Sequence, residues 1–367
     1  GTGVTAFIYD GGRIRSSHND FEGRASFFDG ANQSNHATHV AGTVGAGGPN
    51  RGMAPDVTIV SAGFETGGGG GIFLYANPGD FEADYSNAFN NLGADVSNNS
   101  IGTNTATNGF PCDITGDYGL MASLIDGAVR GSLTDGRPIR IVWANGNERQ
   151  SSRCGDLFNT TAPPAGAKNH ITVGALNAND DSMTGFSNWG PVDDGRIKPD
   201  ISAPGCESGG DGGVTSLSSG SDTSYSTLCG TSMAAPTVAG VSALLIEHHR
   251  NLFPGSDDPR NSTIKAILAH TAQDLGNTGP DYQFGYGSVR ANDAALLMLT
   301  RNYTETEVGQ DGSATFEVNV EGGGFGQFQA TIAWDDAPAI PNVDTALVND
   351  VDLVITDPNG VRHYPWT

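Results

Sequence analysis

Ser232 places a hydroxyl that could act as a nucleophile at the start of a helix. It lies in residues 230–236 (GTSMAAP), and the small and apolar residues up to 246 predict a helix buried on nearly every side. Gly230 leaves room for another chain, and the first-turn amides can stabilise an anion. A serine here could equally be a helix cap. The local sequence therefore leaves a catalytic and a structural role open.

Asp10 could supply the acid that such a serine needs. It ends the apolar residues 4–9 and precedes two glycines. We therefore expect it at the carboxyl edge of a strand, where open α/β sheets place ligands. The structural alternative is an aspartate of an ordinary turn.

His36 could supply a general base. It begins residues 36–44, whose spacing and small side chains predict a helix, and His39 follows three residues later. The two histidines could instead form a metal pair. No glutamate lies near them and no third ligand is spaced to follow, which argues against zinc.

Strand and helix patterns alternate along the first 300 residues. This alternation predicts an α/β fold, a mostly parallel sheet with helices on both faces. Polar residues, among them Asn147, follow the fourth strand-like run. The strand-like runs are residues 4–9, 57–62, 95–100, 139–144, 170–175 and 198–205, and the helical patterns are 36–44, 81–92, 118–130, 232–246, 262–272 and 291–300.

The composition changes near residue 302. Period-two alternation in residues 315–320, and in parts of 330–334 and 351–356, predicts antiparallel strands. We therefore expect one domain at 1–302 and a smaller antiparallel β-sandwich or barrel at 303–367. The second domain looks incomplete, because the sequence stops just past a turn.

The chain is strongly acidic, with 41 Asp and Glu against 18 Lys and Arg and a net charge of −23. This charge argues against nucleic acid and anionic membrane surfaces as partners. No stretch approaches the roughly 18–20 consecutive apolar residues of a membrane helix. Because the sequence opens at Gly1 with neither methionine nor signal peptide, we expect a processed product.

The four cysteines are widely spaced and contain no C-x-x-C pair, which argues against zinc and fits disulfides formed in an oxidising compartment. Spacing alone leaves three pairings open. The cysteines are Cys112, Cys154, Cys206 and Cys229.

Asp10, His36 and Ser232 occur in the order Asp, His, Ser. Residues 9–12 (YDGG), 36–43 (HATHVAGT) and 230–236 resemble the three signature blocks of the subtilisin-like serine proteases, the subtilase family. The resemblance spans residues 1 to about 300. It implies that Ser232 is the nucleophile, His36 its base and Asp10 the residue that orients the imidazole. His39 would then be structural.

The resemblance also implies the groups that surround the reaction. Asn147 would donate to the oxyanion together with the amide of Ser232. Ser100-Ile101-Gly102 would pair with the substrate backbone, and Ala144-Asn145-Gly146 would form a wall of the specificity pocket. These features imply an endopeptidase of broad specificity that favours apolar or aromatic residues before the cut, although Glu148 at the rim complicates that preference.

Residues 194–200 (DGRIKPD) and 347–355 (LVNDVDLVI) resemble one branch, the alkaline subtilases with a C-terminal β-barrel. In the family fold the segments around Cys206 and Cys229 are adjacent. The resemblance thus implies a Cys206–Cys229 disulfide and leaves Cys112–Cys154 beside the substrate pocket.

The sequence departs from the family pattern in several places. Ala37 replaces a glycine, Gly11 a hydroxyl residue and Cys229 an asparagine, and none of these removes a reacting group. Residues 45–52 are too short for the family's usual calcium loop. The usual N-terminal segment and an inhibitory propeptide are missing.

Structural calcium must therefore bind elsewhere if it is present. We take Asp350 and Asp352, with Asp335 and Asp336, as candidate ligands, because hard cations prefer clustered oxygen atoms. The same aspartates could instead discourage strand pairing at a solvated edge.

We expect a secreted, extracellular serine endopeptidase that acts on proteins or peptides. A propeptide or the remaining β-strands could be supplied by a separate chain. One alternative is a catalytically silent binding or surface protein of the same fold, which the truncated ends favour. The other is a metalloenzyme that uses His36 and His39.

Overall fold

The computed structural model describes residues 1–64, 74–151, 153–154, 157–320 and 328–365. Its centre is a seven-stranded sheet with the order β2-β3-β1-β4-β5-β6-β7, in which all neighbours are parallel. The strands are β1 (Thr5–Asp10), β2 (Ala25–Phe27), β3 (Thr58–Gly63), β4 (Val96–Asn99), β5 (Arg140–Ala144), β6 (Ile171–Asn177) and β7 (Ile201–Cys206).

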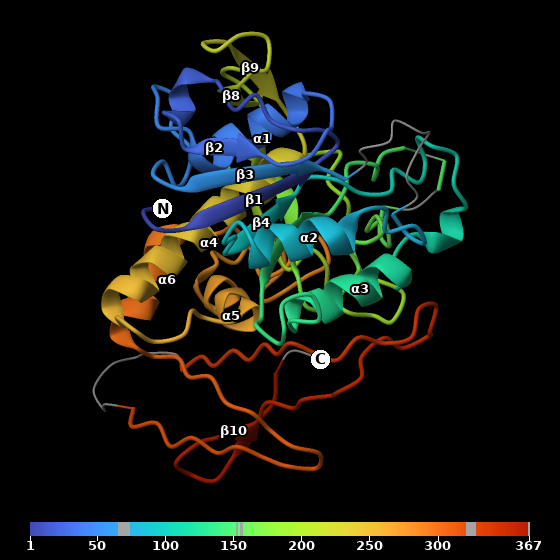
Figure 1. The fold of residues 1–367 in the computed structure, drawn as a ribbon. Coiled ribbons are helices and arrows are strands. Elements are labelled where there is room, and N and C mark those ends of the chain that lie inside the picture. The colour runs from blue at the N-terminus through green and yellow to red at the C-terminus, as the bar shows by residue number, and fades with distance from the viewer. Residues whose placement is uncertain (65–73, 152, 155–156, 321–327, 366–367) are drawn as a thin grey trace.

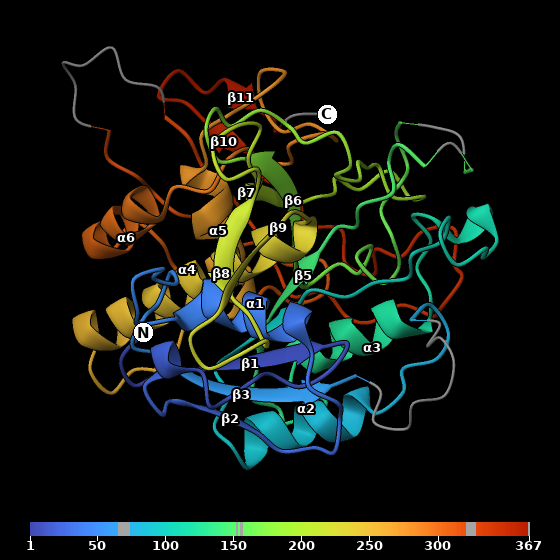
Figure 2. The same cartoon turned by 90° about the horizontal axis from the view of Figure 1, so that it is seen from above.

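Helices cover both faces of this sheet (Figures 1 and 2). Ala6 and Ile8 of β1 pack in one core with four helices, whereas Phe7 and Tyr9 pack in a second core with the other two. Successive side chains of a strand point to opposite faces, so β1 contributes to both cores. The first four helices are α1 (Asn35–Gly45), α4 (Thr231–Leu252), α5 (Asn261–Thr271) and α6 (Ala291–Thr300), and the other two are α2 (Phe81–Asn90) and α3 (Leu120–Val129).

The predicted α/β class is confirmed, and each predicted strand and helix of the first 300 residues is present within a few residues. Short elements were not foreseen: the edge strand β2 of the sheet, which lies in a polar segment expected to be a loop, the 3₁₀ turns η1 (Asn19–Phe21) and η2 (Cys112–Ile114), and the antiparallel hairpin β8 (Val214–Leu217) and β9 (Tyr225–Leu228). No helix in the described part of the chain is long and apolar enough to cross a membrane.

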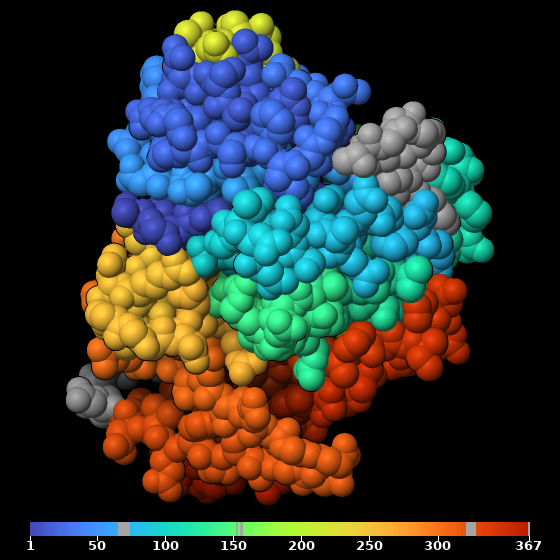
Figure 3. Space-filling view, viewed as in Figure 1, coloured from blue at the N-terminus to red at the C-terminus, as the bar shows by residue number. Residues whose placement is uncertain are grey.

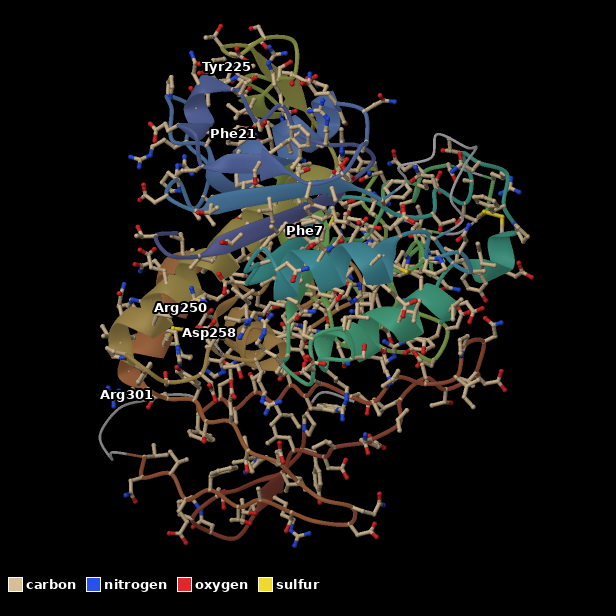
Figure 4. The ribbon with its side chains drawn as sticks, in the orientation of Figure 1. Phe7, Phe21, Tyr225, Arg250, Asp258 and Arg301 are labelled. Atoms are coloured by element: carbon tan, nitrogen blue, oxygen red, sulfur yellow. A yellow bond between two sulfur atoms is a disulfide. The ribbon has the colours of Figure 1, made fainter. Side chains whose placement is uncertain are left out.

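The long helix α4 is fixed at its far end by a charge pair. Arg250 binds both oxygens of Asp258, with Nε at 2.8 Å and Nη2 at 2.6 Å (Figure 4). Asp95, just before β4, accepts a further bond from the same guanidinium. These contacts join the C-terminal turn of α4 to the sheet, so the helix is held at both ends.

The C-terminal strands expected from alternation are mostly not formed. Residues 315–320 and 330–334 have no strand structure, and of 351–356 only β10 (Ile355–Thr356) pairs, with β11 (Arg362–His363). Alternating residues form a strand only where a neighbour supplies hydrogen-bond partners, and none of the described residues does so here. The division at residue 302 stays a prediction.

Part of this C-terminal segment instead lies against the first 300 residues, where Figure 3 shows it in orange and red below the green part that includes α3. Lys168 Nζ donates to Asp336 Oδ2 at 2.7 Å, and both side chains are buried. Asn169 exchanges two hydrogen bonds with the Asp336 backbone, at 2.7 and 2.8 Å. Residues around 336 are therefore part of the packed structure.

Candidate active site

The predicted site residues gather at the carboxyl ends of parallel strands, where α/β sheets bind their ligands. Asp10 is the last residue of β1, and Ser100 follows β4. Tyr9 of β1 is paired with Asn99 of β4, so the next residues, Asp10 and Ser100, end neighbouring strands about 4.8 Å apart.

His36 lies in the first turn of α1 and faces Asp10. Its Nδ1 is 2.8 Å from Asp10 Oδ1 and 3.0 Å from Oδ2. Ser34 caps this helix through a 3.2 Å bond from the Ala37 amide to its Oγ, which fixes the turn that carries the histidine. Because a carboxylate only accepts, Nδ1 carries the proton and Nε2 of the neutral ring is left as a base.

The surroundings of His36 favour its protonated form. Burial lowers the pKa of the imidazole, but the charge of Asp10 and the hydrogen bond to it outweigh burial, so the pKa of His36 is raised. The Asp10 side chain is only 2 % exposed, whereas that of His36 is 38 % exposed. The buried acid thus holds a ring that a substrate can still reach.

His39 has the structural role expected for it. Burial lowers the pKa of His39 to about 4, and its Nε2 lies 2.9 Å from the carbonyl oxygen of Val214 in β8. One nitrogen of each ring is therefore engaged, Nδ1 of His36 with Asp10 and Nε2 of His39 with Val214. Among the described residues no group of three or more His, Cys, Asp and Glu side chains is placed to hold a metal.

Ser232 is the second residue of α4, and Gly230 is the N-cap, so the serine is not the helix cap. Its Oγ donates to the Ser100 carbonyl oxygen at 3.2 Å, and the Ser100 hydroxyl donates to the Ser232 carbonyl oxygen at 2.8 Å. In a regular helix that carbonyl would accept from residue 236, but Pro236 has no N–H. The proline thereby frees the carbonyl that binds Ser100.

The described residues contain no hydrogen bond between Ser232 and His36, so this link of the triad stays a prediction. Each partner is instead anchored to its own strand end, His36 to Asp10 and Ser232 to Ser100. Since these two strand ends are neighbours, the arrangement keeps the nucleophile and the base on adjacent supports.

Two N–H donors lie close to Gly230, whose lack of a side chain leaves room between them. A Cβ atom on Gly230 would lie 3.4 Å from the Ser232 amide nitrogen and 3.6 Å from Asn147 Nδ2. Thr231 fixes the amide of Asn147, because both its N–H (2.8 Å) and its hydroxyl (2.9 Å) donate to Asn147 Oδ1. Neither flanking donor has a partner in the described part of the chain, so the pair can bind an anion next to the serine.

The first predicted substrate segment, Ser100-Ile101-Gly102, continues from the end of β4. The Ile101 carbonyl oxygen accepts from Trp143 Nε1 at 2.6 Å and is therefore taken. Both backbone groups of Gly102 lack a partner within the described ranges. Gly102 is thus the peptide unit that remains open for pairing.

The second segment, Ala144-Asn145-Gly146, begins with the last residue of β5. Ala144 and Asn145 are buried, and Asn145 Nδ2 donates to the Asn188 carbonyl oxygen at 2.6 Å. The Gly146 amide donates to Thr231 Oγ1 at 3.1 Å. The segment is therefore tied to the nucleophile turn, and its part in a specificity pocket stays a prediction.

Glu148 is not a free charge at the rim. Its carboxylate accepts from the backbone amides of Ala106 and Thr107, at 2.9 and 2.8 Å. It lines a small cavity together with Thr105, Ala106, Thr115, Ser151, Cys154, Thr160 and Ala162. Two amide donors thus already satisfy the charge that complicated the expected apolar preference.

Both disulfides implied by the family resemblance are present. Cys112 is bonded to Cys154 and Cys206 to Cys229. Cys206 ends β7 and Cys229 directly precedes Gly230, whose amide donates to the Gly205 carbonyl at 2.9 Å. This second disulfide therefore fixes the approach to the nucleophile turn.

The expected calcium cluster is not formed. Asp336 is paired with buried Lys168, and Asp335 accepts from the Ser262 hydroxyl at 3.0 Å. Asp350 and Asp352 are exposed, and no third carboxylate joins them within the described residues. The prediction fails because the ammonium group of Lys168 takes the most buried carboxylate, and the four aspartates do not fit a calcium ion.

Two residues of the site had not been predicted. Thr231 orients the side chain of Asn147, and its place beside Ser232 in the signature block was the available signal. Asn188 forms hydrogen bonds with residues on both sides of Asn147, although it lies 40 positions after Glu148 in the sequence. Nothing in its local sequence distinguishes it from an ordinary loop asparagine.

Comparison with known proteins identifies relatives of this chain. The Subtilase family pattern matches residues 12–287, a range that includes His36, Asn147 and Ser232 and begins just after Asp10. Alkaline serine exoprotease A of Vibrio alginolyticus is 28 % identical over 319 residues, 85 % of this chain and 47 % of its own. Subtilisin-like protease 2 of Pseudogymnoascus destructans is 31 % identical over 257 residues, 67 % of this chain and 52 % of its own.

The chain thus spans about half the length of these two relatives. Among solved structures, a cold adapted subtilisin-like serine proteinase is 26 % identical, with a TM-score of 0.54 over 78 % of this chain and 87 % of that one. A lanthipeptide protease shares the fold, with a TM-score of 0.59 at 23 % identity over 80 % of this chain and 87 % of its own. With three quarters of its length matched by the family pattern, this chain belongs to the subtilase family.

Proposed function

We propose that this subtilase is a serine endopeptidase that cleaves peptide bonds through Asp10, His36 and Ser232. The observation that carries the proposal is the pair of unpartnered N–H donors beside Gly230, next to the Ser232 hydroxyl. A serine with only a structural role would not need two unpartnered N–H donors beside it. The hydrogen bond from His36 to buried Asp10 supports the same conclusion.

In the proposed reaction Ser232 Oγ attacks the carbonyl carbon of the scissile bond while His36 Nε2 takes its proton. Asp10 stabilises the imidazolium that forms. The oxyanion receives hydrogen bonds from the Ser232 amide and from Asn147 Nδ2. His36 then protonates the leaving amine, and water hydrolyses the acyl-enzyme by the same steps in reverse order.

The proposed substrates are extended segments of proteins or peptides. The free N–H and C=O of Gly102 support pairing with a peptide backbone, which tolerates many sequences. Satisfaction of Glu148 by two backbone amides supports a preference for apolar or aromatic residues before the cut. A peptide library in which only Lys or Arg is accepted at that position would contradict this preference.

We further propose that the protein works outside the cell. Two disulfides fit an oxidising compartment, and the charge of −23 fits a highly soluble protein. The resemblance to the alkaline branch with a C-terminal barrel, and the supply of a propeptide or further strands by another chain, remain parts of this proposal.

The test is labelling by a serine-directed fluorophosphonate, compared between the native chain and Ser232→Ala. We expect the label on Ser232 and none on the variant, with peptide hydrolysis lost in parallel. A folded native chain that neither takes the label nor cleaves peptides would favour a silent binding protein. Hydrolysis that proceeds without labelling and stops with a chelator would favour a metalloenzyme.

A further inference from the structure

Asn188 is a buried residue that binds the polypeptide on both sides of Asn147. Its Oδ1 accepts from the Glu148 amide at 2.8 Å, and its Nδ2 donates to the Asn145 carbonyl oxygen at 3.2 Å. Its side chain is fully buried. One side-chain amide therefore spans the residues that precede and follow the candidate oxyanion donor.

The backbone of Asn188 adds two more bonds to the same loop. Its amide donates to the Gly146 carbonyl oxygen at 3.0 Å, and its own carbonyl oxygen accepts from Asn145 Nδ2 at 2.6 Å. Four hydrogen bonds thus join a single residue to residues 145–148. Asn147 itself is exposed.

The space around Asn188 is closed. Gly146 has a φ of +102°, and a Cβ at Gly146 would lie 2.3 Å from Asn188 Nδ2 and 2.9 Å from the Ala162 side chain. Gly146 therefore has to be a glycine so that the amide of Asn188 can lie against its backbone. A side chain at residue 146 would therefore force the loop or the Asn188 amide to shift.

We propose that Asn188 is a positioning residue for the oxyanion donor Asn147, an inference that rests on the proposed serine endopeptidase function. Thr231 sets which end of the Asn147 amide faces the anion, and Asn188 sets where the backbone that carries the amide lies. A hydrogen-bond donor acts on a transition state only when it is held at the right place beforehand. Asn188 supplies this restraint without touching the substrate.

The first test is the kinetics of Asn188→Ala on a peptide substrate. The variant loses two of the four hydrogen bonds and keeps the two made by the backbone, so the loop can still form. We expect kcat to fall about 10-fold with KM changed less than about 2-fold, because the restraint acts on the transition state. An unchanged kcat in a folded variant would overturn the proposal.

The decisive test is a double-mutant cycle with Asn147→Ala, which we expect to lower kcat about 100-fold, the magnitude known for such a donor in subtilisin. Once the donor is absent its position no longer matters, so Asn188→Ala should lower kcat less than about 2-fold in the Asn147→Ala background. A further 10-fold loss there would show that Asn188 acts on the fold in general, and would overturn the proposal.

Asn169→Ala is the matched control. Asn169 is also buried, and its side chain makes three hydrogen bonds, two to the Asp336 backbone and one to the Asp126 carbonyl oxygen. We expect Asn169→Ala to lower the melting temperature while kcat stays within about 2-fold. If Asn188→Ala does not fold, the same cycle is run with Asn188→Ser, which keeps a small polar group. Failure of the native chain to take the fluorophosphonate would defeat the proposed function instead, which separates the two outcomes.

Discussion

Ser100 and Ser232 exchange two hydrogen bonds, hydroxyl to carbonyl in each direction, at 2.8 and 3.2 Å. The exchange joins the end of β4 to the first turn of α4. It holds the nucleophile beside the strand that neighbours β1, where Asp10 binds His36. In this state the Ser232 hydroxyl donates to the Ser100 carbonyl oxygen. This hydrogen bond has to break before the hydroxyl can donate to His36.

Ser100→Ala removes the donor that satisfies the Ser232 carbonyl group, which Pro236 cannot replace. We expect a loss of about 1–2 kcal/mol in the free energy of unfolding, since a carbonyl group is left unpaired, and a fall in kcat of about 10-fold. Urea denaturation and steady-state kinetics measure the two effects. Ser123→Ala is the control, because its hydroxyl also donates to a backbone carbonyl oxygen, that of Ala339 at 2.8 Å, without contacting the site residues. A Ser100→Ala variant with native kcat would refute the coupling.

The raised pKa of His36 predicts the pH dependence of activity. Only the neutral imidazole can take the proton of Ser232, so kcat/KM should rise with pH through the pKa of His36, above the ordinary value of about 6.5. Asp10→Asn removes the charge that raises this pKa. The rise should then move to lower pH, while kcat falls about 10⁴-fold.

The raised pKa of His36 also predicts how the stability of the fold depends on pH. A group whose pKa is raised by folding stabilises the fold fully below its unfolded pKa, and this contribution is lost as pH rises through the folded value. The native chain should therefore lose a small part of its stability between about pH 6.5 and the pKa of His36. Asp10→Asn should lack that loss. Identical pH dependence of unfolding in both proteins would contradict the assignment.

Asp336→Asn leaves buried Lys168 without its nearest charged partner. Removal of one partner of a buried pair typically costs about 3–5 kcal/mol, so we expect a loss of that size in the free energy of unfolding. Asp350→Asn, at an exposed carboxylate, should change stability by less than about 0.5 kcal/mol. Equal effects of the two substitutions would mean that the segment around residue 336 is not docked in solution.

The two disulfides should affect different kinetic parameters. Loss of either one, as Cys206→Ser with Cys229→Ser or Cys112→Ser with Cys154→Ser, should cost about 3–4 kcal/mol for their sequence separations of 23 and 42. The first pair adjoins the nucleophile turn and should lower kcat. The second lies at the cavity that Glu148 lines and should raise KM. Peptide kinetics on both double variants would settle this, and reversed effects would count against the site described above.

Most of the parallel sheet could be predicted because its strands are short and largely apolar runs that end at glycine or polar residues, whereas the three residues of edge strand β2 lie in a polar segment and were missed. β1 is the clearest example, since Ala6 to Tyr9 is buried on both faces. The hairpin of β8 and β9 was missed because each strand has only four residues, most of them Ser, Thr or Tyr, and only Ser216 and Leu217 are buried. Of the strands expected after residue 302 only the end of 351–356 is formed, as β10, because alternation indicates a possible strand and not the presence of a pairing partner.

The reacting groups of the site could be predicted, because Asp10, His36 and Ser232 lie in the family's signature blocks. The residues that hold these groups could not, because their partners are set by the fold. Lys168 illustrates this, since its buried pairing removed Asp336 from the expected calcium cluster. Asn188 illustrates it again, as no local pattern relates it to Asn147.

The bare Cα of Gly230 gives this chain a vulnerability at one position. A methyl group there would occupy the space between the Ser232 amide and Asn147 Nδ2, which the proposed reaction needs for an oxygen that is charged only during the chemical step. The Gly230→Ala variant would therefore keep every reacting group, but its added methyl group would block the oxyanion site. Natural variation at this position would thus separate active proteases from inactive homologues of the same fold.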